Sequence, residues 1–126
     1  MSEPLKAVVI SHSGVAAALV EAVQAIAGDT GPFVTVSNAG ATRESLCADL
    51  SAAVGTGPAV IFVDMPGGSC LYAAMAGIKD RDDVAVVAGV NLPMLLDFAF
   101  HRDLTPAEAA NHAVEAGTKS IRALRA

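Results

Sequence analysis

The sequence predicts an α/β protein built on a doubly wound parallel sheet, with the strand order 2-1-3-4 and helices on both faces. Strand-like and helix-like segments alternate along the chain, which is typical of a parallel sheet covered by helices. The strand-like segments are short apolar runs rich in β-branched residues, as expected of strands buried on both faces. Topology rules for such sheets place the first and third strands side by side, with a switch point between them.

The first half of the chain contains two predicted strands and two predicted helices. Leu5–Ile10 is the first strand, and Gly14–Ala27 is a helix that stops at Gly28. A short strand, Phe33–Val36, follows. Thr42 is a predicted N-cap for a helix that runs to about Val54. The predicted buried stripes are Val15, Leu19, Val23 and Ile26 on the first helix, and Leu46 and Leu50 on the second.

The second half continues the alternation and ends in two consecutive helices. Ala59–Val63 is the third and most apolar strand, and Val84–Ala88 is the fourth. A helix from Ser69 to about Ala76 lies between them. Asn91-Leu92-Pro93 opens a helix that ends near His101, and Thr105-Pro106-Ala107-Glu108 is a capping box. The predicted apolar stripe of the last helix is Val114, Gly117, Ile121 and Leu124.

The composition indicates one domain, residues 1–126, and excludes several classes of protein. Hydrophobic residues form 53% of the chain and charged residues 17%, which argues against disorder. The net charge of −5 leaves no basic stripe for nucleic acid. No apolar run is long enough to span a bilayer, so we expect no direct membrane insertion. The two cysteines, Cys47 and Cys70, are expected to be buried and reduced, which favours a cytoplasmic location.

Two polar segments follow the ends of predicted strands, where α/β proteins gather their chemistry. His12, within Ser11-His12-Ser13-Gly14, follows the first strand, and Asp64 follows the third. A neutral imidazole is a nucleophile at neutral pH, and a carboxylate on its other nitrogen would fix the tautomer. Gly67, Gly68 and Ser69 lead into a helix N-terminus whose N–H groups could hold phosphoryl oxygens, as could Ser13.

The same residues are also compatible with a structural role, as a capping histidine, an Asx turn and a tight glycine turn. The chain has neither a G-x-x-x-x-G-K-[ST] loop nor a G-x-G-x-x-G motif, so we expect no nucleotide cofactor. His101 and His112 fall on predicted helices far from His12. No set of His, Cys and acidic residues has the sequence spacing of metal ligands, so we also expect no metal.

Three segments together resemble the mannose-type enzyme IIA domains of the bacterial phosphoenolpyruvate-dependent sugar phosphotransferase system (PTS). Val8–Gly14 resembles the family's strand and phosphohistidine segment. Phe62–Ser69 resembles its Asp-x-x-Gly-Gly-Ser turn, and Gly89–Leu95 resembles its Gly-x-Asn-Leu-Pro-Met segment. The resemblance covers nearly the whole chain in order and spacing, and it departs from the family pattern at Ser13, at Pro66 and at Cys70-Leu71-Tyr72.

The resemblance implies a phosphotransferase that acts through a phosphohistidine. His12 would accept a phosphoryl group from the phosphocarrier protein HPr and pass it to an enzyme IIB partner for sugar transport. Asp64 would orient His12, Ser69 and nearby amides would hold the phosphate, and Asn91, Leu92 and Pro93 would line the crevice. The resemblance also implies a homodimer. Because the sequence ends at Ala126, we expect a single IIA domain with no fused IIB domain.

Other functions stay open at this point. A phosphotransfer subunit of a dihydroxyacetone kinase tolerates a Ser after the histidine, as Ser13 is here. A regulatory phosphoprotein that feeds no transporter would retain the same His12 and Asp64. A hydrolase using Ser69, His12 and Asp64 is disfavoured because Gly67–Leu71 lacks the last glycine of a nucleophile elbow.

Overall fold

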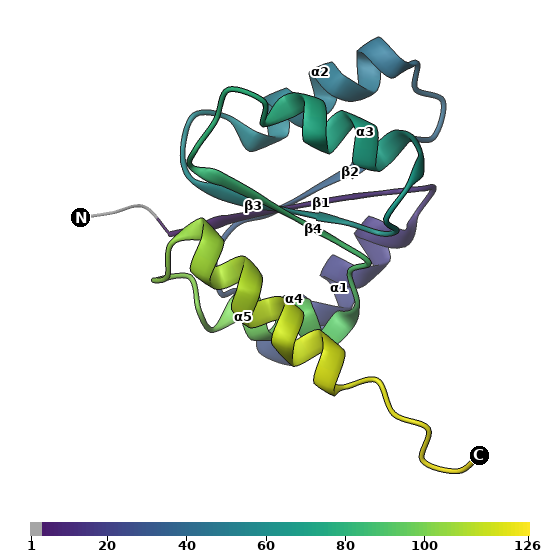
Figure 1. The fold of residues 1–126 in the computed structure, drawn as a ribbon, viewed down its shortest axis with the longest axis vertical. Coiled ribbons are helices and arrows are strands. Elements are labelled where there is room, and N and C mark those ends of the chain that lie inside the picture. The colour runs from purple at the N-terminus through teal and green to yellow at the C-terminus, as the bar shows by residue number, and fades with distance from the viewer. Residues whose placement is uncertain (1–3) are drawn as a thin grey trace.

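The computed structural model describes residues 4–126, which form a four-stranded parallel sheet with helices on both faces (Figure 1). The strand order is β2-β1-β3-β4, which confirms the predicted order 2-1-3-4. Central strand β1 pairs with β2 and β3, and Ile10 of β1 lies opposite Val63 of β3. The elements, in chain order, are β1 (Lys6–Ser11), α1 (Val15–Ala27), β2 (Phe33–Ser37), α2 (Arg43–Val54), β3 (Ala59–Val63), α3 (Gly68–Gly77), β4 (Val84–Ala88), α4 (Leu92–Ala99) and α5 (Pro106–Lys119).

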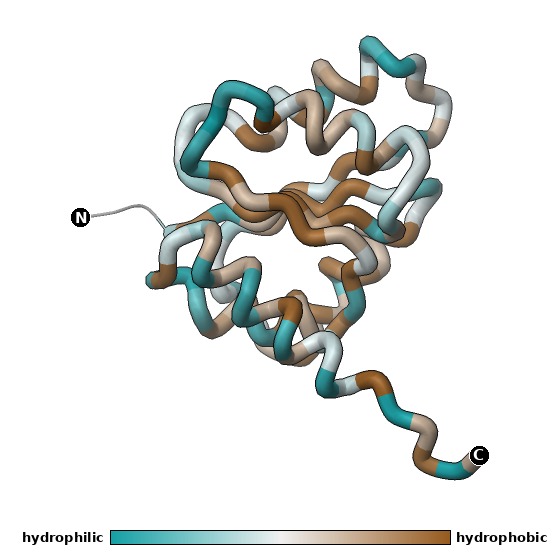
Figure 2. Tube along the Cα trace, in the orientation of Figure 1, coloured by the Kyte–Doolittle hydropathy of each residue, from teal (hydrophilic) through white to brown (hydrophobic). Residues whose placement is uncertain are grey.

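The sheet separates two apolar cores. Helices α2 and α3 cover one face, and α1, α4 and α5 cover the other (Figure 1). Successive strand residues point to opposite faces, so β3 sends Ile61 and Val63 into the first core and Phe62 into the second. All five residues of β3 are buried, and the hydropathy-coloured trace shows the sheet as a mainly apolar layer between the helices (Figure 2). No helix within residues 4–126 combines the length and the apolar character that crossing a bilayer demands.

Local sequence signals account for where the helices begin. Thr42 and Ser45 form a reciprocal capping box at the start of α2, and Thr105 and Glu108 form another at the start of α5. Asn91 caps α4 by accepting a hydrogen bond from the Met94 N–H. These three N-termini were predicted from the residue types alone.

The predicted apolar stripes of two helices were partly wrong. Val15 and Ile26 of α1 are 45% and 64% exposed, and the buried residues are Ala16, Val20 and Val23. Helix α5 ends at Lys119, so Ile121 and Leu124 lie beyond it and are exposed. The buried residues of α5 are small, namely Ala109, Ala110, Ala113 and Gly117. Small side chains let α5 pack closely. The prediction was right for Gly117 and wrong for the larger Val114, Ile121 and Leu124, which are exposed.

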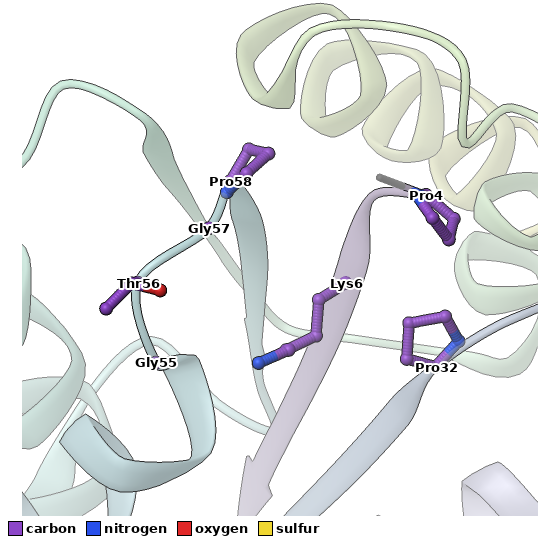
Figure 3. Close-up of a pocket in the computed structure, with 7 residues that line it drawn as sticks. All are labelled: Pro4, Lys6, Pro32, Gly55, Thr56, Gly57 and Pro58. Atoms are coloured by element: carbon purple, nitrogen blue, oxygen red, sulfur yellow. The ribbon is translucent and has the colours of Figure 1, made fainter. Parts of the chain in front are cut away.

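Three cations tie together the edge of the sheet where the strands begin. Lys6 Nζ donates to the carbonyls of Ala53 and Val54 at the end of α2. Arg102 donates to the carbonyls of Leu5 and Pro32, and Arg81 donates to those of Gly55 and Gly57. A hollow of about 470 Å³ opens beside Lys6, which extends toward the Gly55–Gly57 segment (Figure 3). Each of the three cations donates to carbonyls from other segments of the chain, whereas Nε and Nη2 of Arg102 are buried without a hydrogen-bond partner among residues 4–126. This edge therefore serves to connect segments of the fold.

Candidate functional site

The polar residues of interest gather at the opposite edge of the sheet, where the strands end. His12 follows β1, Asp64 follows β3, and Asn38 follows β2. The loops that carry them lie on the right of the sheet in Figure 1. Because β1 lies between β2 and β3, the three side chains emerge from neighbouring strands. The switch-point argument therefore correctly predicted that His12 and Asp64 lie at the edge of the sheet where the strands end.

His12 makes two hydrogen bonds to one oxygen of Asp64. Its main-chain N–H and its ring Nδ1 both lie 2.9 Å from Asp64 Oδ2. The two side chains differ in exposure, since that of His12 is 41% exposed and that of Asp64 is 14% exposed. The imidazole is thus accessible to solvent, while its Nδ1 is hydrogen-bonded to a mostly buried carboxylate.

The ionisation of Asp64 fixes which nitrogen of His12 carries the proton. Burial acts to raise the pKa of Asp64, but the hydrogen bonds from the main chain and the ring of His12 outweigh it and lower the pKa below its usual value. A carboxylate ionised at neutral pH only accepts hydrogen bonds. Nδ1 must therefore be the protonated nitrogen of a neutral His12, which leaves a free lone pair on Nε2.

The Nε2 atom of His12 faces the glycine turn at the start of α3. A Cβ built on Gly68 would lie 3.4 Å from Nε2 and 3.5 Å from Cε1. Gly68 also has a φ of +83°, a left-handed conformation that side chains disfavour. The first N–H groups of a helix have no partner within the helix, so the N-terminus of α3 beside Nε2 can accept an anion.

Asn38 links Ser13 to Ser69 across this site, and the sequence analysis missed it. Its Oδ1 accepts from the Ser13 N–H at 3.1 Å, and its Nδ2 donates to Ser69 Oγ at 3.4 Å. Ser13 has a φ of +50°, and Ser37 Oγ donates to its carbonyl. The rule that selected His12 and Asp64 also applies to Asn38, because it directly follows the second strand of the same sheet.

Cys70, on α3, lies next to the imidazole of His12. It is fully buried, as predicted, whereas Cys47 is only half-buried. Its Sγ is 3.9 Å from His12 Nδ1. Burial and the neighbouring charge of Asp64 raise the pKa of the Cys70 thiol. The thiol therefore stays protonated and acts as part of the packing under the ring.

Asn91, Leu92 and Pro93 form the start of α4 and are not bonded to His12. The Asn91 side chain accepts from Met94 and donates to the carbonyl of Gly117 at 3.2 Å. These bonds connect α4 to α5. The predicted role of the three residues in lining the crevice stays a prediction.

Two groups of side chains have metal-ligating atoms close together. One consists of His12, Asp64 and Cys70, and the other of Asp97, His101 and His112; in each, the ligand atoms lie within 4.8 Å of one another. Asp97 and His101 are four residues apart, but His112 comes from α5, and the first group joins the ends of β1 and β3 to α3, so sequence spacing did not reveal either full group. In both groups a histidine is hydrogen-bonded to the carboxylate, His12 Nδ1 to Asp64 in the first and His112 Nδ1 to Asp97 in the second.

The arrangement at the strand ends is suited to nucleophilic transfer of an anionic group. It combines an exposed imidazole with a free Nε2 lone pair, a carboxylate behind the ring, and helix N–H groups beside the nucleophile. Ser69 Oγ is hydrogen-bonded to Asn38 rather than to an imidazole, so the geometry does not activate Ser69.

Comparison with known proteins identifies relatives over most of the chain. Residues 6–115 match the EIIA-man family, described as the PTS system fructose IIA component. Over 96 residues the chain is 36% identical to the PTS system mannose-specific EIIAB component of Escherichia coli strain K12. That match covers 75% of this chain and 30% of the relative, so the chain corresponds to less than a third of that protein.

Solved structures share the fold. The mannose/sorbose-specific IIA subunit of Enterococcus faecalis superposes with a TM-score of 0.85 at 24% identity, over 100% of this chain and 97% of that one. The EIIA component of Streptococcus agalactiae gives a TM-score of 0.87 at 18% identity, over 94% and 96% of the two chains.

Proposed function

The chain belongs to the EIIA-man family of sugar phosphotransferase system components, and on that premise we propose that His12 is its phosphoryl-carrying residue. His12 accepts a phosphoryl group from phospho-HPr and passes it to an enzyme IIB protein. The observation that carries the proposal is the pair of 2.9 Å contacts from His12 to Asp64 Oδ2, which leave Nε2 as the nucleophile.

The transfer is an in-line displacement at phosphorus. Nε2 of neutral His12 attacks the phosphorus, the P–N bond of the donor phosphohistidine breaks, and its electron pair returns to the donor imidazole. The His12 proton stays on Nδ1, hydrogen-bonded to Asp64, so the carboxylate offsets the positive charge that develops on the ring. Asp64 therefore orients the ring and stabilises the charge, and it takes no proton.

The glycine turn holds the transferred group. Gly68 brings the backbone close to Nε2, Gly67 precedes it as the N-cap of α3, and the first N–H groups of α3 with Ser69 Oγ bind phosphoryl oxygens. Ser13 supplies a further polar group from the His12 loop. Asn38 positions these phosphate-binding groups because it is hydrogen-bonded to both Ser13 and Ser69.

The remaining parts of the proposal concern the setting of this reaction. The chain functions as a single IIA unit in the cytoplasm and as a homodimer, and it meets HPr and a IIB protein at the His12 edge. Asn91, Leu92 and Pro93 line the rim of the crevice at the start of α4. A role in regulation, or as a phosphotransfer subunit of a dihydroxyacetone kinase, uses the same His12 chemistry with a different acceptor.

Phosphorylation in a reconstituted system tests the proposal. The protein is incubated with phosphoenolpyruvate, enzyme I and HPr, and its intact mass is measured beside those of His12→Gln and His112→Gln. We expect one acid-labile phosphoryl group on the wild type and on His112→Gln, and none on His12→Gln. An unmodified wild-type protein in the presence of active phospho-HPr would overturn the proposal.

The acceptor is identified in a second step. The phosphorylated protein is mixed with a IIB protein, and separately with a dihydroxyacetone kinase core and its substrate. Rapid loss of the phosphoryl group to the IIB protein supports a transport function. Transfer to the kinase alone would contradict it while leaving the role of His12 intact.

A further inference from the structure

A second polar cluster lies between α4 and α5, away from the sheet edge that carries His12. Asp97 lies on α4, His101 lies just beyond its end, and His112 lies on α5. The two helices pack side by side against the lower face of the sheet in Figure 1. The Asp97 side chain is 13% exposed, whereas His101 and His112 are 36% and 48% exposed. The carboxylate is thus mostly buried, and both imidazoles remain within reach of solvent.

The Nδ1 atoms of both histidines converge on this carboxylate. His112 Nδ1 lies 2.9 Å and 2.8 Å from the two oxygens of Asp97. His101 Nδ1 lies 3.5 Å from Asp97 Oδ1 and 2.7 Å from the main-chain oxygen of the same residue. The two rings are tilted by 35°, with centroids 4.1 Å apart. One carboxylate and two imidazoles therefore present their ligand atoms to a common point.

We propose that Asp97, His101 and His112 form a binding site for a divalent transition-metal ion, of which Zn²⁺ is the test case. Two imidazole nitrogens and a carboxylate oxygen are ligands that Zn²⁺ prefers. In tetrahedral coordination with bonds of 2.0–2.1 Å, neighbouring ligand atoms lie about 3.3 Å apart. With Asp97 Oδ1 as the ligand, the separations of 2.9 Å to His112 Nδ1 and 3.5 Å to His101 Nδ1 bracket that value, so these contacts need only small side-chain movements.

Metal binding requires a change of tautomer and no net release of protons from neutral rings. When Nδ1 of each histidine binds the ion, the ring proton moves to Nε2. Because the rings are partly exposed, this Nε2–H can donate a hydrogen bond to water. His101 gives up its hydrogen bond to the Asp97 carbonyl, and Asp97 exchanges its hydrogen bond from His112 for the metal. The −1 charge of the carboxylate offsets part of the charge of the ion.

The surroundings leave room for further ligands on the ion. A hollow of about 330 Å³ lies beside His112 and is lined also by Glu115, Ala116 and Lys119. Glu115 is paired with Lys119 at 2.7 Å, so it is not needed for the site. Three protein ligands and an open position completed by water are typical of an accessible zinc site rather than a closed structural one. The ion would join α4 to α5.

Zinc titration of matched variants tests this inference independently of the phosphoryl-transfer proposal. The reference is the untagged His12→Gln variant. This substitution removes the histidine from the other group of potential ligands, which consists of His12, Asp64 and Cys70. Zn²⁺ affinity and stoichiometry are measured by competition with a chromophoric chelator. The same measurement follows in His12→Gln with His101→Gln or His112→Gln added, and circular dichroism checks that each variant is folded.

We expect one equivalent of Zn²⁺ to bind the reference variant, and the unfolding midpoint to rise with it. Loss of an outer partner of a metal ligand typically costs 10- to 100-fold in affinity, so removing a direct ligand should weaken binding by at least about tenfold. Bound Co²⁺ should give no thiolate absorption, because Cys70 is not a ligand. No binding to the reference, or an affinity in both histidine variants equal to that of the reference, would overturn the inference.

Discussion

The main-chain N–H and the ring Nδ1 of His12 share a single acceptor, Oδ2 of Asp64, at 2.9 Å each. The main-chain bond fixes the start of the His12 loop, and the ring bond fixes the orientation of the imidazole. One carboxylate thus positions both the backbone and the side chain of the same residue. The first two predictions follow from this contact.

Asp64→Asn should slow phosphoryl transfer on the order of a hundredfold or more, by analogy with losses seen when an orienting carboxylate becomes an amide. The amide can still accept from the main chain, but it offers no charge to stabilise the developing imidazolium. Rapid-quench measurement of transfer from phospho-HPr gives the rate, and circular dichroism gives the fold. A variant that is folded and transfers at the wild-type rate would remove Asp64 from the mechanism.

The pH dependence of stability should also change in this variant. The folded-state pKa of Asp64 lies below its unfolded value of about 3.9, so its stabilisation is present above that pH and is lost as the pH falls through the folded pKa. Urea unfolding should show wild type more stable than Asp64→Asn by about 1 kcal/mol at neutral pH. The difference should shrink near pH 3, and a difference that stays constant would contradict the assignment.

Gly68→Ala should reduce both stability and transfer. A left-handed φ of +83° costs alanine about 1 kcal/mol, and the new Cβ would lie 3.4 Å from His12 Nε2, where the phosphoryl group must bind. Gly28→Ala is the matched control, because Gly28 has a φ of +75° and a Cβ there meets no atom within 4 Å. Equal loss of transfer in both variants would show that strain, rather than obstruction of Nε2, is the cause.

Gly117→Ala should destabilise the fold by about 1–3 kcal/mol, although alanine normally favours a helix. Its Cβ would clash with Met94 Cγ and lie 2.9 Å from Asn91 Oδ1, so these side chains, or α4 and α5 themselves, would have to shift. In Gly77→Ala the new Cβ meets only Leu50 Cδ2, at 3.9 Å, so that variant should be neutral or more stable. Urea unfolding compares the two, and the opposite ranking would show that α5 adapts without cost.

The sequence was sufficient to predict the sheet order and the edge that carries His12 and Asp64. Both follow from local signals, namely apolar runs, caps and the rule that chemistry lies at strand ends. The packing of α5 was predicted only at Gly117, because its buried face consists of small residues such as Ala109 and Ala113 rather than a stripe of large ones. The group of Asp97, His101 and His112 was missed because two helices must pack before its members meet.

The contact between His12 and Asp64 also has a consequence for folding fidelity. Both faces of β3 are apolar, so hydrophobicity alone does not penalise a strand that slips by one residue along β1. Such a slip moves the strand by roughly 3.3 Å, which separates His12 from Asp64 and sends Phe62 into the opposite core. The hydrogen bonds between His12 and Asp64 therefore favour the native register of the two central strands, and a chain with slipped strands would lack the proposed phosphoryl-transfer site.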